Sequence, residues 1–253
     1  MVTFVVKGRI EMELLEKATA SFRQNSAFTL AEVLITLGII GVVAALTIPV
    51  VMNNANEKET IVSLKKSYSI LTSAYTQAVQ DNGTPDLWGA DPLVVLKPYL
   101  KISKDCTTTL GGCFSPGVTY KFLNGGNEIE NDSTGQTAVQ LADGSSLMYQ
   151  NDSSDCTQSV GTTQALQAYC GQIYVDINGN KRPNQWGIDA FIFHFTKFGI
   201  VPFGTAPETR WPFSAECHDI SKSGYSCSGW VIYNENMDYK RCDDLAWDGK
   251  HKC

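Results

Sequence analysis

Glu32 is a carboxylate placed where a charge is costly, at the leading edge of a long apolar stretch. The 20 residues from Val33 to Met52 contain no Asp, Glu, Lys or Arg. A helix of that length covers about 30 Å, the thickness of the hydrocarbon core of a bilayer. An acid at the centre of such a span costs roughly 2.5–3.5 kcal/mol, and less near its edge. Glu32 therefore needs a partner, and nothing nearby in the sequence supplies one.

A second group of oxygen-bearing side chains lies between two predicted strands, at Asp176, Asn178, Asn180 and Asp189. Oxygens at alternate positions suit Ca²⁺, which takes several oxygen ligands from flexible backbone. The spacing is not that of an EF-hand, because the twelfth position of the loop is Gly187. In the alternative, Asn and Asp bond their own backbone in an Asx-rich turn. We favour the turn and keep Ca²⁺ as the one candidate cofactor.

The chain has 8 cysteines, and all of them follow the apolar stretch: Cys106, Cys113, Cys156, Cys170, Cys217, Cys227, Cys242 and Cys253. An even number on one side of a membrane segment predicts disulfides in an oxidising compartment. Zinc is disfavoured, since no pair has the two-residue spacing of a zinc knuckle and the three histidines are scattered. The sequence does not fix the connectivity. As a first guess, each cysteine pairs with its neighbour in the sequence. A bond between Cys227 and Cys242 is the competing possibility.

Catalytic constellations are missing from the sequence. It has no Gly-x-Ser-x-Gly elbow, no phosphate loop and no His-Glu-x-x-His helix, so we do not expect an enzyme. The formal charge is −6, of which the first 27 residues contribute +1 and the remainder −7. A nucleic-acid partner is not expected, because phosphate contacts need a basic patch.

The elements that position these groups begin with one long helix. After Met52, apolar residues at spacings of three and four form one stripe over residues 53–81, and the opposite side is polar. Pro49 removes one helical hydrogen bond and should bend the helix near the membrane surface. The run Asp81-Asn82-Gly83-Thr84-Pro85 is a stop signal.

The region after the helix reads as β-rich. The strongest β signals lie in residues 172–204, where Phe191, Phe193 and Phe195 share one strand face. His194 lies on the other, less apolar face and is not expected to be a catalytic base. Further strand candidates are Val118–Leu123, Thr137–Leu141, Ser146–Tyr149 and Cys227–Tyr233. We expect the aromatic residues near the last cysteines to form the core of a small stapled subdomain rather than an exposed binding face.

The stretch from Ala27 to Pro49, with Phe28 and Glu32, resembles the processing and assembly segment of type IV pilins and type II secretion pseudopilins. The resemblance implies that prepilin peptidase cuts between Ala27 and Phe28 and methylates the new amine of Phe28. It makes Glu32 the acid required for assembly. Ala27 replaces the usual Gly but is also small. Either Met1 or Met12 serves as the start. In the alternative, an ordinary signal peptide is cut after Ala45, which would leave Glu32 without a purpose.

We therefore expect a pilin-like α+β fold, with a long N-terminal helix on an antiparallel sheet of about four strands and a disulfide-rich C-terminal region. The expected parts are a leader (1–27), a transmembrane and assembly half-helix (28–52), an amphipathic half-helix (53–81) and an exported globular β-rich domain (82–253). Basic residues before the apolar stretch favour a cytoplasmic N-terminus in the inner membrane. The resemblance implies a structural subunit that polymerises with other pilin or pseudopilin subunits. The alternative is a minor pilin at a filament tip that binds substrate, a surface or DNA.

Overall fold

The computed structural model describes residues 29–107, 113–114, 119–128 and 137–253. Ala27 and Phe28 lie outside these ranges, as does the start of the strand candidate Val118–Leu123. The chain divides into two compact units after Met52, and each is treated by itself below. The long helix expected from the sequence is confirmed as α2 (Leu30–Asn82). It continues through Pro49, whose side chain is not described, so the bend stays a prediction.

The unit that ends at Met52 carries its apolar side chains on the outside. Each large hydrophobic residue described in Leu30–Met52 is exposed, with Leu30 at 79% and Leu46 at 72%. Within the described residues α2 is the one helix long and apolar enough to cross a membrane. Apolar surface of this extent is stable only when lipid or other apolar helices cover it.

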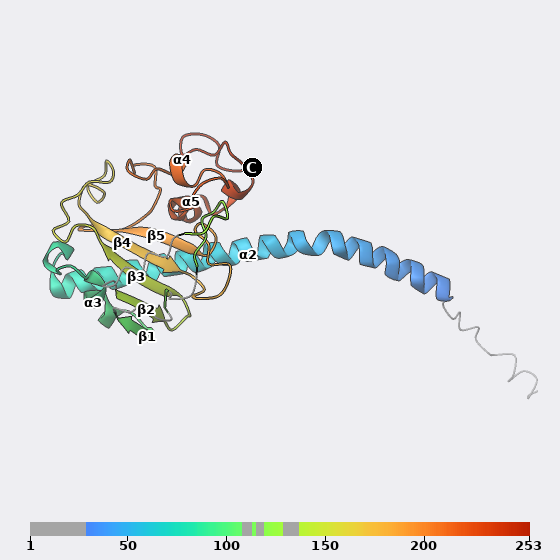
Figure 1. Ribbon diagram of the computed structural model, residues 1–253, viewed down its shortest axis with the longest axis horizontal. Coiled ribbons are helices and arrows are strands. Elements are labelled where there is room, and N and C mark those ends of the chain that lie inside the picture. The colour runs from blue at the N-terminus through green and yellow to red at the C-terminus, as the bar shows by residue number, and fades with distance from the viewer. Residues whose placement is uncertain (1–28, 108–112, 115–118, 129–136) are drawn as a thin grey trace, which may run out of the picture. The chain divides into compact units, whose positions relative to one another are not determined.

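The unit from Asn53 onward is built on an antiparallel sheet whose spatial order equals its chain order, β1 to β6 (Figure 1). The sheet has six strands rather than the expected four or so. Its strands are β1 (Ile102–Thr107), β2 (Thr137–Leu141), β3 (Ser146–Asn151), β4 (Tyr169–Asp176), β5 (Ala190–Thr196) and β6 (Gly199–Pro202). Short helices complete the unit: α3 (Pro92–Leu96), α4 (Phe213–Glu216) and α5 (Cys227–Asn234), with 3₁₀ turns at Pro85–Leu87, Lys97–Tyr99 and Asp238–Lys240.

The amphipathic half of α2 packs its stripe on the central strands, as the spacing predicts. Leu64, Leu71 and Ala78 are fully buried. Tyr68 stacks on Phe193 at 5.6 Å between ring centroids, and Tyr75 meets Phe195 edge-on at 5.7 Å. Each buried side chain of this size contributes roughly 1.5–3 kcal/mol. The core therefore fixes the helix on the sheet.

The opposite face of β5 is also covered, so His194 is buried. His194 stacks on Phe203 with 4.1 Å between ring centroids, and its Nε2 lies 3.0 Å from Oε2 of Glu208. Both side chains are fully buried. The contact between His194 and Glu208 therefore lies inside the core.

The strand predicted at Cys227–Tyr233 is wrong, because these residues form the helix α5. Cys227, Trp230 and Val231 are buried at helical spacing, and the β-branched and aromatic content misled the sequence reading. Gly229 allows α5 to contact β6 closely: its N–H bonds the carbonyl of Phe203 at 2.8 Å, and a Cβ there would lie 2.9 Å from that oxygen. A pleated strand would lose this contact.

The eight cysteines lie in four bonded pairs: Cys106–Cys113, Cys156–Cys170, Cys217–Cys227 and Cys242–Cys253. This is the pairing of sequence neighbours, and Cys227 does not join Cys242. Trp230 and Tyr239 are fully buried beside these bonds, whereas Tyr233 is 57% exposed. The aromatic residues of the C-terminal region therefore serve mainly as its core.

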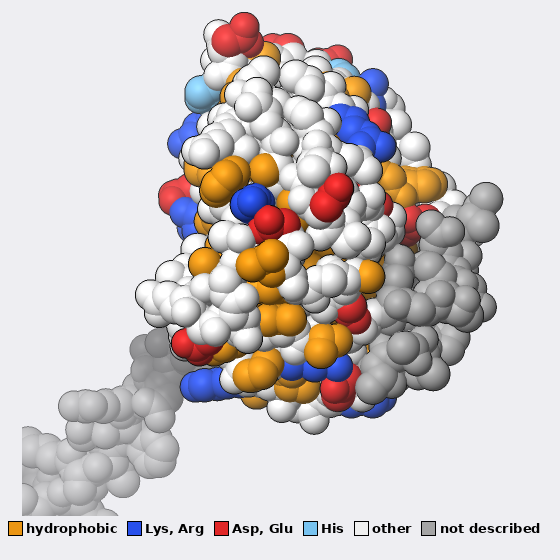
Figure 2. All heavy atoms as spheres, turned by 90° about the vertical axis from the view of Figure 1, so that its left-hand side faces the viewer, with side chains coloured by type: hydrophobic (Ala, Val, Ile, Leu, Met, Phe, Trp, Pro, Cys, Tyr) orange, Lys and Arg blue, Asp and Glu red, His pale blue; other side chains and the backbone are white. Residues whose placement is uncertain are grey.

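The surface of this unit differs from that of the apolar half-helix. On the face shown in Figure 2, hydrophobic side chains occur in small groups separated by polar and charged ones. Such a mixture is ordinary for a solvated domain surface. In the part of the chain that the structure describes, the extended apolar surface is that of Leu30–Met52.

Candidate functional site

Glu32 has a partner three residues away that the sequence reading missed. Thr29 donates two hydrogen bonds to Oε2 of Glu32, from its backbone N at 2.9 Å and from its Oγ1 at 2.8 Å. In return, the backbone N of Glu32 donates to Oγ1 of Thr29 at 3.2 Å. This is a capping box, whose signal is a Thr or Ser followed three residues later by Glu. This signal is present in the sequence and would have been enough to predict the contact.

The capping box also explains how an acid is accommodated at the start of an apolar helix. The first N–H groups of a helix have no internal acceptor and form the positive end of its dipole. Glu32 lies there, and its carboxylate receives two donors. Both bonds use Oε2, so among the described residues Oε1 remains available for a donor from another molecule. The box positions the acid without neutralising it.

The two predicted calcium ligands with charge, Asp176 and Asp189, lie close together in the fold. Asp176 ends β4 and Asp189 directly precedes β5, and the register pairs Asp176 with Ala190. Both carboxylates are buried, at 0% and 2% exposure. Asn178 bridges them, since its backbone N donates to Oδ1 of Asp176 at 3.1 Å and its Nδ2 to Oδ2 of Asp189 at 3.2 Å. The two acids therefore lie together in the interior, at the two ends of the connection between β4 and β5.

Protein donors already contact each of these carboxylates. Tyr120 donates its hydroxyl to Oδ2 of Asp176 at 2.6 Å. The backbone N atoms of Asn184 and Gln185 donate to Asp189 at 2.9 and 2.6 Å. Only the bond from the backbone N of Asn178 to Asp176 has the form of an Asx turn, and the others connect the carboxylates to Tyr120 and to the backbone of Asn184 and Gln185. Asn180, the fourth predicted ligand, is exposed and does not join the group.

Several oxygens around the pair are buried without a hydrogen-bond partner, namely Oδ1 of Asn178, Oδ1 of Asn184 and Oγ of Ser146. Buried polar atoms are rarely left unpaired, and such a group points to a bound water or ion. The donor set of carboxylate, amide and hydroxyl oxygens has the chemistry that Ca²⁺ prefers. Within the described residues, however, no three His, Cys, Asp or Glu side chains form a metal-binding group.

Burial raises the pKa of Asp176 to about 7, with a further contribution from the nearby charge of Asp189 and an opposing one from the Tyr120 hydroxyl. Burial likewise raises the pKa of Asp189, against the hydrogen bonds from Gln185 and Asn184. Two carboxylates in one dry site disfavour double ionisation. At neutral pH the pair is therefore poised to bind either a proton or a cation.

We expect the domain to lose stability as the pH rises when metal ions are chelated. The folded-state pKa of Asp176, about 7, lies above its ordinary value of 3.8, so the stabilisation is complete below about pH 4 and is lost as the pH rises through 7. The full difference corresponds to roughly 4 kcal/mol of unfolding free energy. Urea unfolding from pH 4 to 8 measures most of this loss. Asp176→Asn should flatten the profile, and an equally steep profile in that variant would exclude Asp176 as the source.

The comparison with known protein families identifies the N-terminal segment. Residues 22–48 match the prokaryotic N-terminal methylation motif, a range that includes Ala27, Phe28 and Glu32. No curated protein and no solved structure matches the chain significantly. The long helix, the antiparallel sheet and the four cysteine pairs have the arrangement of a pilin-like α+β fold. The chain therefore carries a prokaryotic N-terminal methylation motif ahead of a fold with a pilin-like α+β arrangement.

Proposed function

We propose that the protein is a structural subunit of a type II secretion pseudopilus or a type IV pilus, processed by prepilin peptidase and polymerised through its N-terminal helix. The observation that carries this proposal is the methylation motif at residues 22–48, which overlaps a helical segment whose described large apolar side chains up to Met52 are exposed. In the membrane, lipid covers that surface. In a filament, the helices of neighbouring subunits cover it.

The parts of the chain follow from this proposal. Residues 1–27 are the leader that the peptidase removes, and residues 28–52 are the membrane and assembly segment. Residues 53–81 attach that segment to the exported domain, residues 82–253. Before assembly the subunit spans the inner membrane once, with its N-terminus in the cytoplasm. Basic residues upstream of the apolar stretch, and cysteine pairs downstream of it, support this orientation.

Glu32 supplies the assembly chemistry in this proposal. Cleavage between Ala27 and Phe28 creates a new amine, and that cation can bond Oε1 of Glu32 in a neighbouring subunit. In a medium of low dielectric, the attraction offsets the desolvation of both groups. It also fixes the axial register, because the bond forms only at the axial offset that brings the amine of one subunit to the depth of Glu32 in the next. Thr29 holds the acid in place through Oε2.

Filament incorporation tests the proposal against a role at the tip. The tagged full-length chain is expressed in a host with a working pseudopilus or pilus, and filaments are sheared and labelled with gold-conjugated antibody. A structural subunit is expected along the filament. Label confined to one end would favour the minor-pilin alternative, and absence from filaments in a strain that cleaves the leader would reject both.

Calcium binding at the Asp176–Asp189 site is a second proposal, favoured by the unpaired buried oxygens of Asn178 and Asn184 beside two carboxylates. Asp176, Asp189, Asn178 and Asn184 would hold the ion, which would neutralise the pair and clamp the connection between β4 and β5. Asn180 lies outside the group.

Thermal melting of the full chain in calcium and in chelator tests this second proposal. A ligand at 100 times its dissociation constant adds about 2.7 kcal/mol to stability, so calcium should raise the melting temperature by several degrees. Asp176→Asn should abolish the difference, and Asn180→Ala should retain it because Asn180 is exposed. Equal melting temperatures in calcium and chelator would show that the loop is only a turn.

A further inference from the structure

One disulfide differs from the other three in its access to solvent. The six cysteines of the first three pairs are buried, with exposures from 0% to 4%. In the fourth pair, Cys253 is exposed and Cys242 is half-buried. Because attack on a disulfide requires access to one of its sulfur atoms, the four bonds should differ widely in their rate of exchange.

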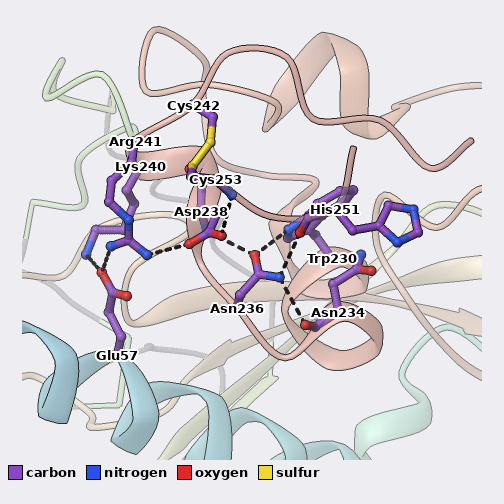
Figure 3. Close-up of polar contacts among 10 residues, drawn as sticks. All are labelled: Glu57, Trp230, Asn234, Asn236, Asp238, Lys240, Arg241, Cys242, His251 and Cys253. Atoms are coloured by element: carbon purple, nitrogen blue, oxygen red, sulfur yellow. Dashed lines mark hydrogen bonds and ion pairs between the residues drawn. A yellow bond between two sulfur atoms is a disulfide. The ribbon is translucent and has the colours of Figure 1, made fainter. Parts of the chain in front are cut away.

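The accessible disulfide closes a loop that organises a chain of polar contacts (Figure 3). The backbone N of Cys253 donates to Oδ2 of Asp238 at 2.9 Å. The other carboxylate oxygen of Asp238 accepts a bond from Nη2 of Arg241 at 2.5 Å. Asp238 therefore connects the position of Cys253 to the orientation of the Arg241 guanidinium.

The same guanidinium reaches Glu57 on α2. Nη1 of Arg241 donates to Oε1 of Glu57 at 2.7 Å, and Nζ of Lys240 donates to the same oxygen at 2.9 Å. The Glu57 side chain is only 12% exposed. Burial alone would raise the pKa of Glu57, but the bonds from Arg241 and Lys240 outweigh it and lower that pKa. The charge of Glu57 is thus compensated by Lys240 and Arg241, which directly precede Cys242 in the chain.

We propose that Cys242–Cys253 is a site of thiol–disulfide exchange with a dithiol, and that its reduction releases Arg241 and Lys240 from Glu57. A thiolate of the dithiol attacks Sγ of Cys253, and the Cys242 thiolate leaves. The second thiol of the reagent then displaces Cys253, so that the dithiol is oxidised to a disulfide and both cysteines become thiols after proton uptake. The proposal concerns the globular unit and is independent of filament assembly.

Release follows from the loss of one constraint. Without the disulfide, Cys253 no longer holds its N–H against Asp238, and the Asp238–Arg241 contact loses its support on that side. An exposed guanidinium gains little from an ion pair unless its geometry is fixed beforehand. The first turns of α2 in this unit, residues 53–60, then exchange their amide hydrogens faster because local opening becomes easier.

Selective reduction is the first test. The full-length chain in detergent is treated with dithiothreitol under native conditions, alkylated and mapped by peptide mass spectrometry. Cys242 and Cys253 should be labelled at least about tenfold faster than the six buried cysteines. Labelling of any other pair at the same rate would overturn the assignment, as would resistance of all four pairs until the protein unfolds.

Hydrogen exchange of residues 53–60 tests the release. Exchange should rise on reduction, and should be equally high without reductant in a Cys242→Ser, Cys253→Ser double variant. Glu57→Gln should show the same rise with its disulfide intact, and reduction should add little to it, because both changes remove one contact. Asp244→Asn is the control, since it breaks the Lys250 ion pair within the same loop but leaves Glu57 untouched. An unchanged rate after reduction, or a full further rise in Glu57→Gln, would contradict the proposal.

Discussion

Glu32→Ala is expected to be cleaved and inserted into the membrane like the wild type but to fail in assembly. The proposed cleavage site at Ala27 and Phe28 and the proposed membrane segment are both unchanged by this substitution. The variant loses the acceptor for the Phe28 amine of a neighbouring subunit. If that contact contributes only about 1.4 kcal/mol net, incorporation already falls tenfold, and a desolvated pair contributes more.

The measurement is the ratio of mature subunit in sheared filaments to mature subunit in the membrane. Glu32→Gln should fail as well, because it retains the shape and the bonds to Thr29 but not the charge. Thr29→Ser is the matched control, since a serine hydroxyl can complete the same capping box. Incorporation of Glu32→Ala at the wild-type level would remove the assembly role of this acid.

Trp230→Ala should cost the globular unit about 3–5 kcal/mol, the usual range for removing a buried aromatic side chain. Trp230 is fully buried, stacks on Phe213 at 4.3 Å between ring centroids and donates its indole N–H to Asn236 at 2.9 Å. Its loss leaves a cavity in the C-terminal region and removes one of the two hydrogen bonds that Oδ1 of Asn236 accepts. Chemical denaturation of the full chain in detergent measures the change in unfolding free energy.

Tyr233→Ala is the control on the same helix, because Tyr233 is 57% exposed. It should change the unfolding free energy by less than about 1 kcal/mol. Similar losses in the two variants would mean that α5 does not bury Trp230 in the way described, and that the C-terminal aromatic residues form a surface after all.

The long helix and the central strands could be predicted because their signals are local. The uncharged stretch, the stripe of residues 53–81 and the alternation of Phe191, Phe193 and Phe195 each identify one element within a few turns of chain. The N-terminal motif is likewise contiguous, so Ala27, Phe28 and Glu32 could be proposed as site residues from the sequence, and the match at residues 22–48 includes all three.

The remaining features depend on contacts between residues that are far apart in the sequence. Asp176 and Asp189 meet because β4 and β5 pair in one register, and Tyr120 joins them from 56 residues away. The helix α5 was mistaken for a strand because its β-branched and aromatic residues favour a strand locally, whereas its packing depends on distant contacts such as the approach of Gly229 to Phe203. The capping box of Thr29 and Glu32 is different, since its signal was in the sequence and was overlooked.

The mass of the mature N-terminus tests the central claim most directly. The chain is expressed with an active prepilin peptidase, purified from membranes and analysed by mass spectrometry of its N-terminal peptide. The prediction is a terminus at Phe28 that carries one N-methyl group, and an uncleaved leader when the peptidase is inactive. A terminus at Leu46 would show that an ordinary signal peptide had been removed, and would contradict both the processing and the assembly role of Glu32.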